Sequence, residues 1–127
     1  MSNRKIINTK EAPKASGPYS QAIKIGNLLF VSGQIAIDPK SNQFIEGDII
    51  EQSELVFKNI KAILEAGGSS LKNSIKVSIF LKDIQDYSLV NEIYAKYFVK
   101  DFPARICVEV SNLPNNAKIE VDIIAFS

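Results

Sequence analysis

The sequence predicts an α+β fold in which a β-sheet carries two helices on one face. Apolar residues alternate with period two in several short segments and recur at helical spacing in two longer ones. The expected order is strands, helix, strand, helix and two final strands, so each helix can connect strands as a crossover. Such a sheet leaves its other face bare, which predicts a partner and therefore an oligomer.

Length and composition limit the function. A chain of 127 residues with 46% hydrophobic residues is typical of one domain with a proper core. The formal net charge of +1 offers no strong field to nucleic acid or to a membrane. No apolar run is long enough to span a membrane, and residues 1–10 lack the apolar core of a signal peptide. The expected location is the cytoplasm.

Two residue counts restrict the chemistry. The sequence contains no histidine, which removes the usual general base and the commonest metal ligand. It contains one cysteine, which excludes an internal disulfide and a multi-cysteine zinc site. We therefore expect no metal, and any catalysis has to use other side chains, backbone groups or water.

The N-terminal part predicts a loop and a hairpin. Residues 5–8 are a short possible strand, and residues 11–21 read as an ordered loop because they are rich in turn formers. The strands Ala22–Ile25 and Leu28–Val31 flank Gly26-Asn27, a pair suited to a tight hairpin turn. The second strand is apolar on both faces, so we expect it to be covered on both sides.

Two helices are predicted from capping and spacing. Asp48, with Glu51 three residues later, has the pattern of a capping box, and Gly67-Gly68 ends the helix. Its apolar stripe consists of Val56, Phe57, Ile60, Ile63 and Leu64. Asp86 is predicted to cap a second helix, which must end before Pro103. The residues at helical spacing there are Tyr87, Val90, Asn91, Tyr94, Tyr97 and Phe98.

The remaining strands carry unusual polar residues. Residues 75–82 alternate, with Ile75, Val77, Ile79 and Leu81 on one face. In the run 102–110, Arg105, Cys107 and Glu109 share a face; in the run 118–125, Lys118, Glu120 and Asp122 do. Two facing strands would thus offer a guanidinium, a thiol and a carboxylate to one place. If Ser111 pairs with Lys118, however, Arg105 and Glu120 lie on the order of 13 Å apart, and a bulge or a second subunit has to join them.

Each polar candidate has a structural interpretation beside the functional one. Arg105 either forms an ion pair with Glu109, Glu120 or Asp122, or clamps a substrate carboxylate. Cys107 is more typical of a small buried apolar residue than of a nucleophile. Glu120 is a solvated charge, a partner of Arg105, or a carboxylate that orients or deprotonates a water.

The loop and helix candidates have the same two interpretations. Tyr19, after Gly17-Pro18, anchors a loop or lines a pocket. Ser32-Gly33 interrupts the strand as a bulge, where an exposed backbone N–H would serve an anionic ligand. Asn91 satisfies a nearby backbone group or contacts a ligand, and Tyr87 belongs to the core or to a pocket wall.

Several segments together resemble the RidA (YjgF) family of enamine and imine deaminases. They are GPYSQ at 17–21, VSGQI at 31–35, and FPARICVEV at 102–110 followed by LPNNAKIEVDIIA at 113–125. The segments NIKAILEAGGSSL and VSIFLKDIQDYSLVNEIYAKYF are similar to the family as well. The resemblance spans nearly the whole chain and implies a single RidA-like domain over residues 1–127.

The resemblance implies a chorismate-mutase-like fold, with three subunits whose sheets face inward as a barrel-like core. Ligand sites would lie in the clefts between subunits. The activity that it implies is hydrolysis of 2-imino acids to 2-oxo acids and ammonia, without a cofactor. The implied substrates are 2-iminobutanoate and 2-iminopropanoate, together with 2-aminoacrylate, the enamine form of the latter. The alternatives are a non-catalytic small-acid sensor or chaperone-like protein, and a ribonuclease or translation inhibitor. The near-neutral charge makes nucleic acid an unlikely partner.

The resemblance also implies roles for single residues. Arg105 matches the arginine that binds the substrate carboxylate, and Glu120 matches the carboxylate that positions the attacking water. Cys107 matches a position whose backbone contacts the ligand. Tyr87 falls where the family often has phenylalanine, which implies a residue of the pocket wall with an added hydroxyl. Tyr87 and Asn91 are both included among the expected substrate-binding residues. The residues expected to line the cleft are Tyr19, Ser32 and Gly33.

Overall fold

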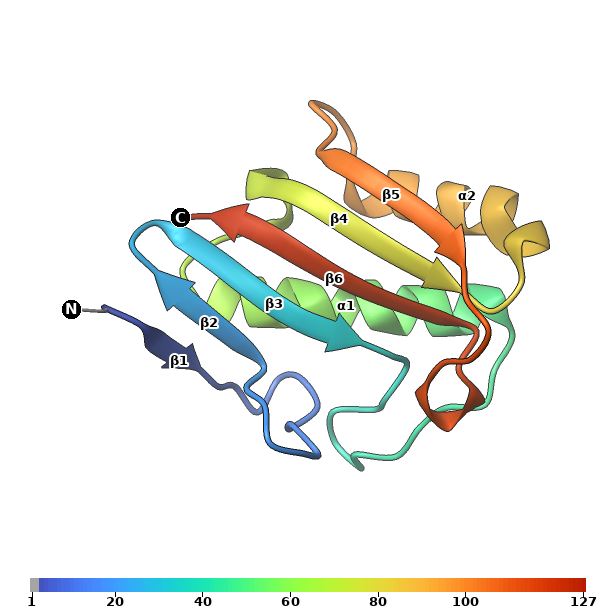
Figure 1. Cartoon of the computed structure of the whole chain (residues 1–127), viewed down its shortest axis with the longest axis horizontal. Coiled ribbons are helices and arrows are strands. Elements are labelled where there is room, and N and C mark those ends of the chain that lie inside the picture. Colours follow the sequence, from blue (N-terminus) through green and yellow to red (C-terminus); the bar gives the residue numbers. More distant parts are fainter. Residues whose placement is uncertain (1–2) are drawn as a thin grey trace.

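The computed structural model describes residues 3–127, which form one mixed sheet with two helices behind it (Figure 1). The strands are β1 (Lys5–Ile7), β2 (Ala22–Ile25), β3 (Leu28–Gln34), β4 (Ser74–Leu81), β5 (Ala104–Glu109) and β6 (Ile119–Phe126). The helices are α1 (Ile49–Ala66) and α2 (Tyr87–Tyr97). This arrangement confirms the predicted α+β fold with both helices on one face.

The strand order is β1-β2-β3-β6-β4-β5. All neighbouring strands are antiparallel except β4 and β5, which are parallel and are joined through α2. Within the described residues 3–127, neither helix combines the length and the apolarity that a membrane crossing requires.

Local signals place α1 where the sequence predicts it. The Asp48 carboxylate accepts a hydrogen bond from the Glu51 N–H at 2.9 Å, and the Glu51 carboxylate accepts one from the Asp48 N–H at 3.4 Å, which completes the capping box. The helix ends at Ala66, before Gly68 takes the left-handed conformation with φ +81°. Its predicted apolar stripe is fully buried against the sheet.

The start of α2 differs from the prediction. The Asp86 side chain makes no capping hydrogen bond, so its predicted role is wrong. Instead, Asp83 accepts a hydrogen bond from the Gln85 N–H at 2.9 Å and opens a 3₁₀ turn, Ile84–Asp86, that runs into the helix. The additional turn moves the cap three residues upstream. The helix ends at Tyr97, before Pro103 as predicted.

The hairpin between β2 and β3 is confirmed, with Gly26 at φ +58°. The prediction that β3 is covered on both sides is wrong within the chain. Leu28 and Phe30 remain 36% and 42% exposed, whereas Leu29 and Val31 are buried under the helices. The bulge predicted at Ser32-Gly33 is confirmed, because the register of β3 with β6 shifts between Val31 and Gln34.

A second bulge changes which residues of β4 lie on the buried face. The register with β6 shifts between Ser74 and Lys76, so Ile75 does not join the buried face. Its side chain is 41% exposed, while Val77, Ile79 and Leu81 are fully buried as predicted.

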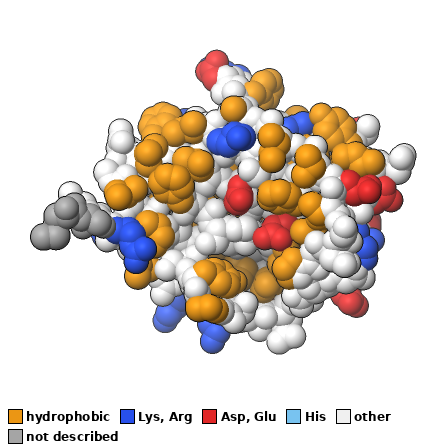
Figure 2. Space-filling view, viewed as in Figure 1, with side chains coloured by type: hydrophobic (Ala, Val, Ile, Leu, Met, Phe, Trp, Pro, Cys, Tyr) orange, Lys and Arg blue, Asp and Glu red, His pale blue; other side chains and the backbone are white. Residues whose placement is uncertain are grey.

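The sheet face opposite the helices, called here the open face, is rich in exposed apolar side chains. Figure 2 shows them spread over the sheet with a few charges among them. The exposed members of this patch on the strands are Ile6, Ile25, Leu28, Phe30, Ile106, Val108 and Phe126. Exposed apolar patches of this kind are typical of surfaces that another molecule covers, and the partner expected from the sequence stays a prediction.

Candidate functional site

The two final strands are not neighbours, because β4 lies between them. Arg105 is level with Val77 on the helix-covered face, whereas Glu120 is level with Phe80 on the open face. The expectation that these two strands face each other is therefore wrong. Of the two ways left open to join Arg105 and Glu120, a bulge within one chain is excluded by their placement on opposite faces. The predicted site residues fall into two groups on opposite sides of the sheet.

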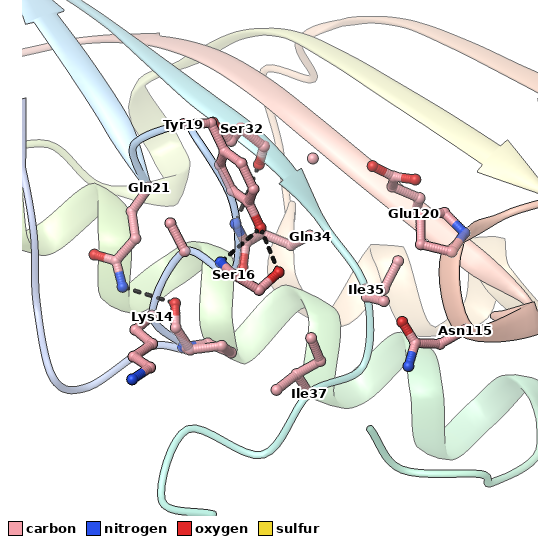
Figure 3. A pocket seen from close by; sticks show the side chains of 14 residues that line it. Lys14, Ser16, Tyr19, Gln21, Ser32, Gln34, Ile35, Ile37, Asn115 and Glu120 are labelled. Carbon is pink, nitrogen blue, oxygen red and sulfur yellow. Dashed lines mark hydrogen bonds between the residues drawn. The ribbon is translucent and has the colours of Figure 1, made fainter. Parts of the chain in front are cut away.

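The first group lines a cavity of about 430 Å³ on the open face. Tyr19, Ser32, Gly33 and Glu120, which the family resemblance assigns to the ligand site, all line this cavity; Figure 3 shows Tyr19, Ser32 and Glu120 there. The other residues of the cavity wall are Pro13, Lys14, Ala15, Ser16, Gln21, Gln34, Ile35, Ile37, Pro114 and Asn115. The N-terminal loop, the bulge of β3 and the turn before β6 thus converge on the carboxylate of Glu120. We call this group the Glu120 cavity.

Glu120 is packed closely against the bulge of β3. A Cβ atom at Gly33 would lie 3.0 Å from the Cδ atom of Glu120 and would overlap one of its carboxylate oxygens, so no larger residue fits there without displacing that side chain. Burial, with a smaller contribution from the nearby Asp122 carboxylate, raises the pKa of Glu120. A carboxylate with a raised pKa is a better proton acceptor than a fully solvated one.

Ser32 supports the bulge rather than offering a free donor. Its N–H donates to the Gln21 carbonyl at 2.9 Å, and its hydroxyl donates to the Ser20 carbonyl at 2.6 Å. The prediction of an exposed backbone N–H for an anion is therefore wrong for Ser32. Both bonds tie β3 to the end of the N-terminal loop.

Gln21 holds that loop in place, and sequence reasoning missed it. Its side chain is only 3% exposed; its amide donates to the carbonyls of Thr9 at 3.0 Å and Pro13 at 2.8 Å and accepts from the Thr9 N–H at 2.8 Å. Tyr19 is then fixed by Ser16, whose N–H and hydroxyl both lie 3.3 Å from the phenol oxygen (Figure 3). The sequence did contain one signal for Gln21: the backbone N–H and C=O groups of the adjacent loop, residues 11–21, need hydrogen-bond partners.

The second group surrounds Arg105 on the helix side, where β5 forms the edge of the sheet. The guanidinium lies over the ring of Tyr94, with Cζ 4.7 Å from its centroid, and donates to the Tyr87 hydroxyl at 3.1 Å. Asn91 lies between these two tyrosines on α2 and is partly buried. We call these residues, with Cys107, the Arg105 cluster.

The structural alternative for Arg105 does not hold within the chain. Over the described residues 3–127, no carboxylate lies within ion-pairing distance of its guanidinium. Glu109 instead accepts a hydrogen bond from the Ile84 N–H at 2.9 Å, and Glu120 and Asp122 are on the other face. A guanidinium seated on aromatic rings without a counter-ion is suited to bind an anion.

Cys107 fits the structural interpretation. It is partly buried and packs against the core. Burial raises the pKa of its thiol, and the nearby Arg105 offsets only part of that rise. The thiol is thus protonated at neutral pH and is a poor nucleophile. Within the described part of the chain, no three His, Cys, Asp or Glu side chains are grouped as metal ligands.

Comparisons with known proteins agree on the family. Residues 9–127 match the model of the family described as Endoribonuclease L-PSP. A RutC family protein of Pyrococcus horikoshii is 54% identical over 123 residues, which cover 97% of this chain and 98% of its own.

Solved structures share the whole fold. RidA of an Antarctic Psychrobacter species is 40% identical, with a TM-score of 0.93 over 97% of this chain and 99% of its own. E. coli TdcF with bound serine is 37% identical, with a TM-score of 0.90 over 97% and 98%. The fold is thus the chorismate-mutase-like one. The chain belongs to the Endoribonuclease L-PSP family, which is the RidA (YjgF) family that its motifs resemble.

Proposed function

We propose that the protein hydrolyses reactive 2-imino acids and their enamine tautomers to 2-oxo acids and ammonia. The observation that carries this proposal is the division of the site: a proton-accepting carboxylate lines the Glu120 cavity, and an anion-binding guanidinium without a counter-ion lies on the other side of the sheet. The relative TdcF, whose structure contains bound serine, supports a small amino-acid-like ligand. The proposed substrates, which the family resemblance implies, are 2-iminobutanoate and 2-iminopropanoate.

The proposed assembly is a trimer in which the open faces pack together. The exposed apolar patch supports this, because its burial would remove a large hydrophobic surface from water. β5 is an edge strand, and we propose that Arg105 at this edge of one copy reaches the Glu120 cavity of the next. The complete site would then contain Glu120, Tyr19, Ser32 and Gly33 from one copy, and the Arg105 cluster from its neighbour.

The proposed reaction needs little from the protein besides orientation. Arg105 binds the substrate carboxylate through a charge-assisted fork and fixes C2 of the protonated imine over the Glu120 cavity. A water attacks C2 while Glu120 accepts its proton, which forms a carbinolamine. Glu120 returns this proton to the nitrogen, and the C–N bond breaks as the hydroxyl proton of the carbinolamine passes to Glu120. Ammonia takes up that proton as it leaves, so a 2-oxo acid and ammonium are released. Because the protonated imine is already electrophilic, no covalent nucleophile is required, and Cys107 takes no part.

An enamine substrate requires one further proton. Its terminal carbon has to be protonated before water attacks C2, which converts the enamine to the imine. The Tyr19 hydroxyl lies in the cavity wall within reach of the Ser16 hydroxyl, and we assign this proton relay to Tyr19 or to a water bound beside it.

The test is a coupled assay. A pyridoxal-phosphate threonine dehydratase generates 2-iminobutanoate, and formation of 2-oxobutanoate is followed with and without the protein. We expect a clear acceleration by the wild type; an unchanged rate would reject the proposed function.

The family description as an endoribonuclease gives the second arm of the experiment. A net charge of +1 and the absence of histidine argue against this activity. Incubation with single-stranded RNA should leave the RNA intact. Cleavage by the wild type, without acceleration of imine hydrolysis, would instead favour the ribonuclease.

A further inference from the structure

The hydroxyl of Tyr87 has a position that a simple pocket wall does not require. Tyr87 is the first residue of α2 and lies beside the edge strand β5. Its oxygen accepts a hydrogen bond from an Arg105 terminal nitrogen at 3.1 Å, and the guanidinium carbon lies 5.6 Å from the centre of its ring. The residue is 41% exposed, so a ligand that approaches Arg105 can also approach this oxygen.

Hydrogen-bond chemistry determines what Tyr87 can still do. A phenol both accepts and donates, whereas a guanidinium only donates. Because the Tyr87 oxygen accepts from Arg105, its own proton is left to bond another group. Arg105 has used one of its five N–H donors, and the others remain for an anion. A donor that accepts from a cation is also polarised by it, which strengthens the bond it makes in turn.

Tyr94 fixes the orientation of this pair. Its ring is buried in the core and covers one side of the guanidinium, with Cζ 4.7 Å from the ring centroid. Arg105 therefore does not have to be ordered when a ligand arrives, and the Tyr87 hydroxyl stays beside it.

We propose that the Tyr87 hydroxyl is a second donor to the ligand carboxylate, so that Arg105 and Tyr87 together form the clamp. This inference rests on the proposed function for the identity of the substrate, a 2-imino acid. Recognition of the carboxylate itself does not depend on that function. Any small acid with a carboxylate beside a planar carbon would be held in this way. The clamp acts on binding, and it takes no part in the attack on C2.

Tyr87→Phe tests the clamp by removing one oxygen atom and leaving the ring. We expect KM for 2-iminobutanoate to rise about tenfold while kcat stays within twofold, since a hydrogen bond to a charged group is lost from binding alone. Tyr97→Phe is the matched control. It removes a hydroxyl from the same helix, but that hydroxyl donates to Glu54 at 2.6 Å, whereas Arg105 bonds to Tyr87. We therefore expect KM and kcat to be unchanged.

A binding measurement separates this inference from the proposed function. NMR titration of the wild type and of Tyr87→Phe gives the dissociation constants of 2-oxobutanoate and of 2-oxobutanamide, which lacks the carboxylate. Tyr87→Phe should weaken binding of the acid about tenfold and leave the amide unaffected. Equal binding of the acid by wild type and Tyr87→Phe would overturn the clamp even if the enzyme is active, and so would a fall in kcat at constant KM. If the wild type lacks deaminase activity but the acid-specific loss appears, the clamp stands and the proposed function fails.

Discussion

The Glu120 cavity and the Arg105 cluster are built in opposite ways. The cavity is fixed by main-chain contacts: the buried Gln21 amide ties the N-terminal loop, and the Ser32 bonds tie the bulge of β3. The cluster is fixed by aromatic rings of α2 packed around an edge strand. One region presents a carboxylate with a raised pKa, and the other a cation that has no counter-ion among residues 3–127.

This difference explains why the chain keeps the two charges apart. If Arg105 and Glu120 met within one chain, they would neutralise each other, and the pKa of Glu120 would fall. On opposite faces of the sheet, the two charges do not compensate each other within one chain. In the proposed trimer, the substrate carboxylate would pair with Arg105 instead. The predictions below test whether the two regions form one site.

The largest effects are expected from removing either charge. Arg105→Ala should reduce kcat/KM for 2-iminobutanoate by at least about a hundredfold, because the carboxylate loses its charged partner. Glu120→Gln should reduce kcat by a similar factor of about a hundred, because the water loses its proton acceptor. Steady-state kinetics in the coupled assay measure both. Wild-type kinetics for Arg105→Ala would show that the guanidinium is not part of the site.

Mixing these two inactive variants tests the division between copies. Each site needs an intact Arg105 from one copy and an intact Glu120 from its neighbour. Random assembly of equal amounts after unfolding and refolding should restore about a quarter of the wild-type activity, since one ordered pair in four is intact. The variants refolded separately are the control. Failure to recover any activity, with mixed oligomers verified by mass spectrometry, would place both residues of a site in one chain.

A smaller effect is expected from Gly33→Ala. The added methyl group would overlap the Glu120 carboxylate, so the side chain has to move, and kcat should fall about tenfold, because small displacements of a catalytic group are costly. Gly17→Ala in the N-terminal loop is the control, since its added methyl group meets no atom closer than 3.4 Å. Equal kcat for the two variants would show that the position of Glu120 is not critical.

The smallest effect concerns pH and stability. Burial and Asp122 raise the pKa of Glu120 in the folded protein above its value in the unfolded chain. The protonated side chain therefore adds to the free energy of unfolding below the unfolded-state pKa, and this addition is lost as the pH rises through the folded-state pKa. Glu120→Gln should therefore make the protein slightly more stable at pH 7, by less than about 1 kcal/mol for a half-exposed group, with no gain at pH 4. Denaturant unfolding at both pH values measures this. A loss of stability at pH 7 would show that the carboxylate is stabilised by its surroundings.

Local signals allowed much of the fold to be predicted. The capping box of Asp48 and Glu51 and the Gly26 turn depend on neighbouring residues only, and both were confirmed. The structure brings Tyr19, Ser32, Gly33 and Glu120 together in one cavity, while their roles in binding and catalysis stay predictions. The sequence left open whether one subunit or two bring Arg105 and Glu120 together, because the period-two pattern of a strand does not identify its neighbours. The insertion of β4 between β5 and β6 depends on a crossover through α2.

Gln21 was missed for a related reason. Its importance comes from the backbone groups that it satisfies in Thr9 and Pro13, and a sequence pattern does not show which main-chain groups lack partners. The exposure of Ile75 had the same origin, since a bulge between Ser74 and Lys76 leaves no mark on the alternation of β4.

The placement of Arg105 and Glu120 on opposite faces has a consequence for how the rate depends on protein concentration. In the proposed trimer, a folded but solitary chain has both side chains and no working site. Specific activity should thus decline on dilution below the concentration at which the copies separate, whereas an enzyme with its whole site in one chain keeps the same turnover per molecule. The total activity in a cell would then fall more steeply than the number of chains, because the turnover per chain would fall as well.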